Sequence, residues 1–455
     1  MALDGNGGKL SLDCLPEDVL FVILSYCDLW TLLRLARVNR TLNQMSSHDS
    51  VWIRIARRCA NIRPSDKRAD NSWKAMCRVS VNWMRGYCKD RCLLRFKCNY
   101  MPCVQLGRPH QILISLGADI VIYNKSKKKN QAYRQRTLCG HTADVAKFVV
   151  CDAYLLSCSM DKTIRLWNTK TWRCDGVLVG HDNGVYSVDG YRDTVISGGR
   201  DGVVKVWSKR SMSCVRELAV HDHVWCVGFN QSSRIALCGT AGHSTVHAPL
   251  QLWSLESGSL VSGFRMEDRG KGRGILSVKW ESPSTFLSCG YDTTVRYWDT
   301  RINPRPGDYM LYHQARPGDH MLYHQEPGDH MLYHQEPGDH VFYHHQGLMI
   351  VCSIISKACN AFVIMCSIVS NACVVSWDDP HDSTVYCLDS DNKWMVVSGT
   401  SRYGVVRVWD KRVRRSVRSF YAGRTSSSPV YSLRFNRTTL VVALANGLRT
   451  LDFSG

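Results

Sequence analysis

The stretch that decides the fold is Ser157-Cys-Ser-Met-Asp161-Lys-Thr-Ile-Arg-Leu-Trp167, because similar stretches recur along the chain. Two of them run from Ser197 to Trp207 and from Ser288 to Trp298. The steps between successive tryptophans, with Trp253 included, are 40, 46 and 45 residues. In the first two copies apolar residues alternate with basic ones before the Trp, which is the period of a half-exposed β-strand. The sequence therefore predicts a mainly β fold made of repeated units.

A Gly-His pair stands ahead of two of these stretches. Gly140-His141 and Gly180-His181 each lie 26 residues before their Trp, counted from the His, and Trp298-Asp299 and Trp409-Asp410 end in a Trp-Asp dipeptide. With this start and this end the repeat resembles the WD-repeat (WD40) family. The resemblance implies that each repeat forms a four-stranded blade of a β-propeller.

The spacing predicts a seven-bladed propeller. A weak first blade ends near Ile122-Tyr123, and the last blade ends at Leu451-Asp452 after its third strand. Because an open edge must be covered, we expect the missing strand to come from the segment before the first blade, near Cys92 to Phe96. Blades 1–5 then occupy residues 104–302, and the end of blade 5 with blades 6 and 7 occupies residues 372–455. The five blades between the first and the last are marked by Trp167, Trp207, Trp253, Trp298 and the run from His381 to Trp409.

Four polar residues recur in the two most regular repeats, and they admit two interpretations. They could form a catalytic His-Asp-Ser set, or a buried hydrogen-bond chain that ties one strand to the next. Several copies of a triad in one chain make no catalytic sense, so we interpret them as structural. No phosphate loop, zinc-ligand spacing or nucleophile elbow supports an enzyme, and we predict no catalytic residue, cofactor or metal. The two sets are His141, Ser157, Asp161, Trp167 and His181, Ser197, Asp201, Trp207.

One step breaks the period, because 111 residues separate Trp298 from Trp409. The surplus, residues 303–371, is a low-complexity insert of tandem repeats. A Pro-Gly-Asp run that begins at Pro306 returns three times, and the segment from Cys352 to Cys359 returns 14 residues later. Such near-identical copies suggest recent duplication, or non-coding DNA read into a gene model.

The insert itself admits three interpretations. His320 and His324 have the spacing of a metal pair on a helix, but the Pro and Gly of each repeat break helices. Residues 347–375 are long enough and apolar enough to span a bilayer, but a span would put the two halves of the propeller on opposite sides of the membrane. We therefore expect a surface loop between two blades, without metal and without membrane contact.

The N-terminal region carries a second module. After a tail of residues 1–10, residues 11–58 read as a run of helices, with Pro16-Glu17-Asp18 at the start of the first and Asp28 able to cap the next. The run from Leu15 to Leu20, then Ile23-Leu24, and a terminal Trp52 resemble the F-box family. Residues 59–103 are expected to form a basic, partly helical linker that supplies the closing strand of the propeller.

An F-box followed by WD repeats is similar to the F-box/WD-repeat proteins, and further runs such as Asn82-Trp83 extend that similarity beyond the two motifs. The resemblance implies a substrate-recognition subunit of an SCF-type (cullin-RING) E3 ubiquitin ligase. The F-box would bind a Skp-family adaptor of the cullin-RING ligase core, and the propeller would bind a protein target for ubiquitination. Helix-in-groove docking needs an apolar face. We assign that face to Leu15, Pro16, Leu20, Ile23 and Leu24.

The residue before the turn Asp of a repeat is the expected substrate contact. In F-box/WD proteins that take phosphorylated targets an arginine stands there, and Arg200 matches it before Asp201. We assign Arg402 to the same place in blade 6, Met160 in blade 2 and Tyr291 in blade 5. Arginine suits phosphate because its planar fork donates two hydrogen bonds. Whether recognition needs phosphate stays open.

The charge is uneven. The formal net charge is +19, and residues 54–136 hold 20 basic and 4 acidic residues. A basic block can attract nucleic acid, but we favour a solvated linker face. A nucleic-acid-binding protein and a WD scaffold outside the ubiquitin system remain alternatives. The chain shows no export signal, so its 21 cysteines should be reduced thiols and its location cytoplasmic and/or nuclear.

Overall fold

The structure of the protein is a computed structural model. It describes residues 15–59, 62, 72–96, 101–107, 111–125, 132–244, 247–264, 272–301, 340–345, 348–353, 373–377, 383–413, 415–422 and 428–454. The chain divides into two compact units. The first contains residues 1–300 and 373–455, and the second contains residues 301–372.

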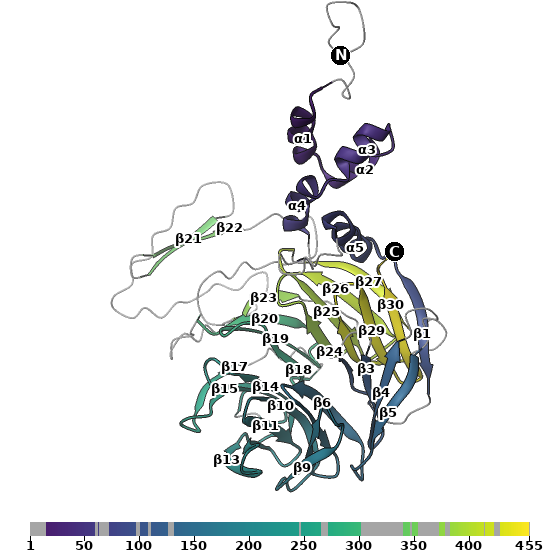
Figure 1. The fold of residues 1–455 in the computed structure, drawn as a ribbon. Coiled ribbons are helices and arrows are strands. Elements are labelled where there is room, and N and C mark those ends of the chain that lie inside the picture. Colours follow the sequence, from purple (N-terminus) through teal and green to yellow (C-terminus); the bar gives the residue numbers. More distant parts are fainter. Residues whose placement is uncertain are drawn as a thin grey trace, which may run out of the picture. The chain divides into compact units, whose positions relative to one another are not determined.

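The described part of the first unit begins with five α-helices (Figure 1). They are α1 (Glu17–Tyr26), α2 (Leu29–Leu35), α3 (Arg40–Ser46), α4 (Asp49–Arg58) and α5 (Trp73–Arg85). Polar caps set two of the boundaries, since the Asp28 side chain accepts from Thr31 N and Asn39 accepts from Leu42 N, each at 2.7 Å. We call residues 15–59, with α1 to α4, the helical module.

Leucines and one tryptophan fill the core of the helical module. Leu20, Leu24 and Leu32 are buried against Trp52, whose indole N–H donates to the carbonyl of Ser46 at 2.5 Å. Helix α5 completes this core with Met76, among others. The helices therefore hold together through one apolar cluster, as their sequence pattern indicated.

The strands of the described residues form seven four-stranded antiparallel sheets, the blades of a β-propeller. Figure 1 shows the blades fanning around a central axis. Blade 1 consists of β2 (Val104–Leu106), β3 (Gln111–Leu116), β4 (Asp119–Lys125) and β5 (Ala132–Leu138), and blade 2 of β6 (Val145–Cys151), β7 (Tyr154–Ser159), β8 (Thr163–Asn168) and β9 (Cys174–Val179). Blade 3 consists of β10 (Val185–Tyr191), β11 (Thr194–Gly199), β12 (Val203–Ser208) and β13 (Ser213–Ala219). Blade 4 consists of β14 (Val224–Asn230), β15 (Ile235–Thr240), β16 (Leu250–Ser254) and β17 (Leu260–Phe264).

The remaining blades use strands from distant parts of the sequence. Blade 5 consists of β18 (Ile275–Trp280), β19 (Thr285–Gly290), β20 (Val295–Asp299) and β23 (Cys373–Trp377), and blade 6 of β24 (Val385–Ser390), β25 (Met395–Thr400), β26 (Val405–Asp410) and β27 (Ser416–Tyr421). Blade 7 consists of β28 (Val430–Phe435), β29 (Thr439–Leu444), β30 (Gly447–Asp452) and β1 (Lys89–Arg95). The first strand of each blade contacts the first strand of the next, from β2 and β6 round to β28.

Strand β1 closes the ring by pairing antiparallel with β30. Arg449 of β30 reinforces the junction with two hydrogen bonds to the Asp90 carboxylate, at 2.8 and 3.1 Å. The closing strand therefore comes from the segment before blade 1, where the sequence indicated it, although it begins three residues earlier than Cys92. The seven-bladed, mainly β fold class is confirmed.

Blade 5 accommodates the insert between two paired strands. Trp298 of β20 lies opposite Cys373 of β23, although residues 300–372 separate the strands in sequence. In the second unit the described residues form a hairpin of β21 (His340–His345) and β22 (Leu348–Ser353), which the sequence analysis did not predict. His320, His324 and most of the tandem repeats lie outside the described residues.

Helix α5 fastens the helical segment to the propeller through Trp83. The Trp83 ring stacks on Phe453 with the ring centroids 3.8 Å apart, and its indole N–H donates to the carbonyl of Arg437 at 2.8 Å. The neighbouring Asn82 amide donates to the carbonyl of Phe453 at 2.8 Å. Residues 59–103, expected as a partly helical linker, therefore supply both an anchoring helix and the closing strand.

Candidate functional site

Helix α1 separates the five residues assigned to adaptor binding. Leu20 and Leu24 are each 1% exposed and belong to the core of the helical module. Their assignment to a docking face is therefore corrected, because a side chain enclosed by its own module offers no surface to a partner. Leu15 is half-buried against the same core, whereas Pro16 and Ile23 are exposed. The last two remain predicted contacts.

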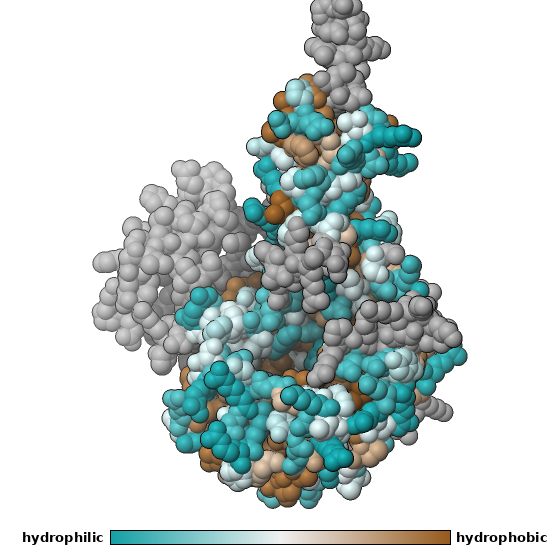
Figure 2. Space-filling model, viewed as in Figure 1, coloured by the Kyte–Doolittle hydropathy of each residue, from teal (hydrophilic) through white to brown (hydrophobic). Residues whose placement is uncertain are grey.

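The exposed side of α1 carries an apolar face, of which the sequence analysis named only Ile23. Val19, Val22, Ile23 and Tyr26 are 44%, 59%, 38% and 73% exposed, and their spacing of three and four residues places them on one face. Figure 2 shows hydrophobic residues reaching the surface of the helical module. An exposed apolar cluster of this kind is typical of a protein-interaction site. We call these four residues the α1 face.

The polar residues of blade 2 form one hydrogen-bond chain. His141 Nδ1 lies 2.7 Å from Asp161 Oδ2, and His141 Nε2 lies 2.8 Å from Ser157 Oγ. The indole N–H of Trp167 donates to the same hydroxyl at 2.8 Å. Ser157 is fully buried, so a substrate could not reach its hydroxyl. The chain ties the loop before the blade to its second and third strands.

Blade 3 repeats this geometry almost atom for atom. His181 Nδ1 lies 2.6 Å from Asp201 Oδ2, His181 Nε2 lies 2.7 Å from Ser197 Oγ, and Trp207 donates to that hydroxyl at 2.8 Å. The two chains hold their turns in the same shape, which is what a structural network requires.

Burial and hydrogen bonding set the protonation of the blade 2 chain. Burial lowers the pKa of His141, although the hydrogen bond to Asp161 opposes the shift. Burial alone would raise the pKa of Asp161, but hydrogen bonds from Thr163, His141 and the Thr142 N–H hold it below its ordinary value. The chain therefore consists of a neutral imidazole that donates from Nδ1 to a carboxylate.

Three of the assigned substrate contacts occupy one equivalent place. Met160, Arg200 and Tyr291 each follow the second strand of their blade. Their backbone N–H groups donate to the carbonyls that precede the first strand, at 3.0, 2.9 and 2.9 Å. The Met160 and Arg200 side chains are exposed and Tyr291 is half-buried, so the end of the blade where these turns lie presents all three.

In blade 6 this place belongs to Ser401, not to Arg402. The Ser401 N–H donates to the carbonyl of Thr384 at 2.9 Å, and Arg402 takes the place that Asp201 has in blade 3. Arg402 is nevertheless exposed on the same turn. The assignment of Arg402 as the equivalent of Arg200 is therefore corrected by one residue.

An extra residue in the blade 6 turn explains the shift. Tyr403 and Gly404 both have positive φ, at 59° and 62°, where blade 3 has Gly202 alone in that region. Accordingly Trp409 donates to Ser398, eleven residues earlier, whereas the Trp of blade 3 donates ten residues back. Counting back from the Trp therefore gave a register that is wrong by one.

Aromatic side chains surround the same end of the propeller. Each is the second residue of the first strand of its blade. The start of this strand pairs with the end of the second strand, where the turns that carry Met160, Arg200 and Tyr291 begin. The rings of Trp225 and Tyr291 lie 5.2 Å apart, and Tyr386 stacks on Tyr431 at 6.0 Å. A Val before each aromatic residue was the available sequence signal. The aromatic residues at this position are Tyr186, Trp225, Tyr386 and Tyr431.

The described basic residues of 54–136 lie on α4, α5, β1, β4 and β5, and several face aromatic rings. The Arg85 guanidinium lies 3.7 Å from the centroid of the Trp30 ring, and that of Arg54 lies 4.4 Å from the centroid of the Tyr26 ring. Lys127, Lys128 and Lys129 lie outside the described residues. Part of this charge thus has partners within the chain.

No helix of the described residues is long and apolar enough to cross a membrane. That part of the chain also holds no group of three or more His, Cys, Asp or Glu side chains arranged to bind a metal ion.

Family models match both modules. The F-box-like model matches residues 12–58. The model of the WD domain, G-beta repeat, matches residues 133–168, 172–208, 265–299 and 371–410. A helical F-box module followed by a propeller of WD blades defines an F-box/WD-repeat protein.

Two relatives match nearly the whole chain. F-box/WD repeat-containing protein 4 of Mus musculus is 32% identical over 454 residues, which cover 96% of this chain and 92% of that protein. The Homo sapiens protein of the same name is 32% identical over 455 residues, with the same coverage. Nuclear distribution protein nudF of Aspergillus niger is 30% identical over 212 residues, covering 42% of this chain and 47% of that protein. The chain belongs to the family of F-box/WD repeat-containing protein 4, and the resemblance seen in the sequence is confirmed.

Proposed function

We propose that the chain is the substrate-recognition subunit of an SCF-type cullin-RING E3 ubiquitin ligase. Its F-box would bind a Skp-family adaptor, and its propeller would bind a protein that is to be ubiquitinated. The chain itself would carry no catalytic residue, because binding and positioning are its whole contribution. The observation that supports the proposal most directly is the α1 face, an exposed apolar surface on a module that already has a complete core of its own.

The adaptor half is tested by co-purification of a Skp-family adaptor with the full chain. Changing Val22→Glu and Tyr26→Glu puts two carboxylates into the docking surface. The first would have to lose water without gaining a partner, and the second would replace the ring that Arg54 faces. We expect adaptor binding to weaken by at least about 100-fold, which corresponds to about 3 kcal/mol. Because both side chains are more than half exposed, the fold should survive.

Val215→Glu is the matched control for that variant. Val215 is 66% exposed on β13, far in sequence from the F-box, so it adds a carboxylate to an exposed valine without touching α1. Undiminished co-purification of the adaptor with the Val22→Glu, Tyr26→Glu variant would reject the α1 face. Equal loss with Val215→Glu would reject it too.

The substrate half rests on the propeller end that carries Arg200 and the aromatic residues. Arg200 and Arg402 belong to blades 3 and 6, which are not neighbours in the ring, so one phosphate would not bridge both. We therefore propose that they contact separate points of an extended substrate segment lying across the aromatic residues. A substrate library with and without phosphate, captured by the immobilised chain, distinguishes a charged contact from a phosphate-specific one.

A further inference from the structure

A pair of cysteines lies where the helical module meets α5. Cys59 is the residue that follows α4, and Cys77 lies in the second turn of α5. The two helices pack directly on each other, and the Trp73 N–H donates to the Asp49 side chain at 2.9 Å. This packing puts both cysteines in one cluster, because Cys77 belongs to the core of the helical module and Cys59 packs against that core.

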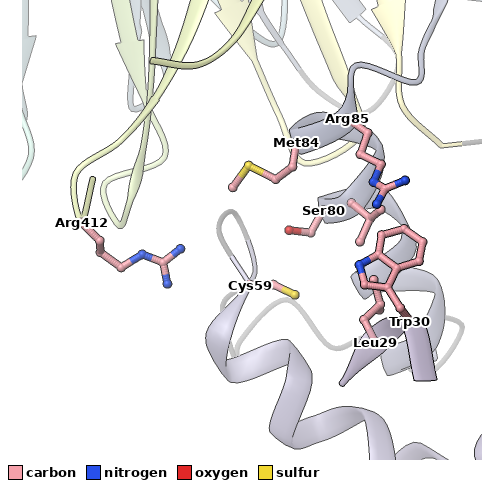
Figure 3. A pocket seen from close by; sticks show the side chains of 8 residues that line it. Leu29, Trp30, Cys59, Ser80, Met84, Arg85 and Arg412 are labelled. Atoms are coloured by element: carbon pink, nitrogen blue, oxygen red, sulfur yellow. The ribbon is translucent and has the colours of Figure 1, made fainter. Parts of the chain in front are cut away.

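Cys59 opens onto a pocket, whereas Cys77 does not reach solvent. The pocket has a volume of about 320 Å³, and Figure 3 shows Cys59, Ser80 and Arg412 around it. Cys59 is half-buried and Cys77 is 0% exposed. A small reagent could therefore reach the Cys59 sulfur before that of Cys77.

The surroundings of Cys59 favour the thiolate. The hydrogen bond from the Cys77 thiol lowers the pKa of Cys59, and burial opposes it. The Ser80 hydroxyl and the positive charges of Arg412 and Lys393 lower it further. The same pairing raises the pKa of Cys77, because its proton is held in the bond. One sulfur is thus prepared as a nucleophile and the other as a proton donor.

The two cations are fixed in place by the propeller. Arg412 is bound through its Nε to Asp410 Oδ1 at 2.9 Å, and in Figure 3 its guanidinium extends toward the helices from the propeller side. The Lys393 ammonium donates to the carbonyl of Ile62. The contribution of these two charges to the lowered pKa of Cys59 therefore requires the helices to be seated on the propeller.

We propose that Cys59 and Cys77 form a peroxide-sensitive thiol pair that closes to an intrachain disulfide between the F-box and α5. In the first step the Cys59 thiolate attacks one peroxide oxygen, the O–O bond breaks, and the hydroxide that leaves takes a proton from solvent. This step gives Cys59 sulfenic acid. The Cys77 sulfur then attacks the Cys59 sulfur, the S–O bond breaks, and the thiol proton of Cys77 leaves with the hydroxide as water. Two thiols are oxidised and one hydrogen peroxide is reduced to two waters.

The disulfide would link the end of α4 covalently to α5. Cys59 directly follows the F-box, and α5 is anchored on the propeller by Trp83. A bond between them would make covalent a junction that is otherwise held by packing. The proposal is independent of the ligase role, since it concerns only the residues of the chain itself.

The test uses the reduced full chain, treated with hydrogen peroxide and then blocked with N-ethylmaleimide. Trypsin should release residues 59–67 joined to residues 75–78, with a mass two hydrogens below the sum of the two free peptides. Cys139 and Cys214 are internal controls because both are exposed. Partial burial together with neighbouring carboxylates raises the pKa of each. We expect the linked peptide at peroxide doses at least about tenfold below those that oxidise the controls.

Two variants separate the roles of the sulfurs. In Cys77→Ala the linked peptide should vanish and Cys59 should stop at sulfenic acid, which dimedone captures. In Arg412→Ala the alkylation of Cys59 by limiting iodoacetamide should slow severalfold, because one stabilising charge is gone. The proposal is overturned if peroxide oxidises Cys139 or Cys214 before Cys59, or if the wild-type chain yields Cys59 sulfenic acid without the linked peptide. The wild-type measurements decide it even where a variant fails to fold.

Discussion

Deleting residues 303–371 should leave the propeller folded. Strand β20 ends at residue 299 and β23 begins at residue 373, and the two are hydrogen-bonded neighbours. After the deletion four residues, 300–302 and 372, would connect them. The equivalent connection in blade 3, between β12 and β13, is also four residues long, 209–212. The shortened connection therefore has a length that this propeller already uses.

The gain in stability follows from loop closure. For a flexible connection each doubling of length costs about 0.6 kcal/mol, and 73 residues are slightly more than four doublings of four. The deletion should therefore raise the free energy of unfolding by about 2.5 kcal/mol and the melting temperature by a few degrees. Removing only residues 317–336 leaves 53 residues in the connection and should change the free energy by about 0.3 kcal/mol.

Thermal unfolding of the intact chain, the full deletion and the partial deletion at one pH compares these values directly. A melting temperature that drops by more than about ten degrees in the full deletion, or a chain that no longer folds, would refute the reasoning and make the insert structural. The partial deletion is the control for a nonspecific effect, because it removes two of the repeats and should behave like the intact chain.

Three further predictions concern other parts of the first unit. Trp83→Ala should lower the free energy of unfolding by about 4 kcal/mol, because it removes a buried ring that stacks on Phe453. Tyr87→Ala, at a residue 61% exposed, should change the free energy of unfolding by less than about 0.5 kcal/mol. Stability measured by urea unfolding should fall as the pH drops below about 6.5, because burial lowers the pKa of His141 and the unfolded chain therefore takes up the proton first; a stability that rises on acidification to pH 5.5 contradicts this. Arg200→Glu with Arg402→Glu should reduce substrate capture by at least about tenfold and leave adaptor binding unchanged, and equal substrate yield would reject the contact.

The parts of the fold that the sequence predicted are those that repeat. The recurring Trp marks the third strand of a blade because its indole must donate to a buried Ser hydroxyl ten residues earlier. Counting such units showed that the last blade lacked its fourth strand and that the fourth strand of blade 5 had to follow the insert. Both strands, β1 and β23, lie where that count required them.

The parts that the sequence did not predict depend on small local differences. In α1 every residue from 19 to 24 is apolar, so the sequence pattern did not separate the buried Leu20 and Leu24 from the exposed Val22. One extra residue in the blade 6 turn moved Arg402 out of the expected register. The thiol pair of Cys59 and Cys77 arises from the packing of α4 on α5, which no spacing in the sequence reveals.

The connectivity of the first unit determines how the two proposed binding sites relate. Helix α5 contacts β27 and the turn between β28 and β29, where the carbonyl of Arg437 lies, and Lys393 stands in the turn between β24 and β25. These turns join the first and second strands of their blades, whereas Arg200 follows the second strand. In an antiparallel blade the two kinds of turn lie at opposite ends, so the F-box attaches to the end of the propeller opposite the aromatic residues.

Variants at the two sites share no contacts, and the effects of such variants are generally additive. The combined variant of Val22→Glu with Arg200→Glu should therefore show the adaptor defect of one and the substrate defect of the other, each at its single-variant size. A substrate defect in Val22→Glu alone, measured without adaptor, would show that the two ends communicate.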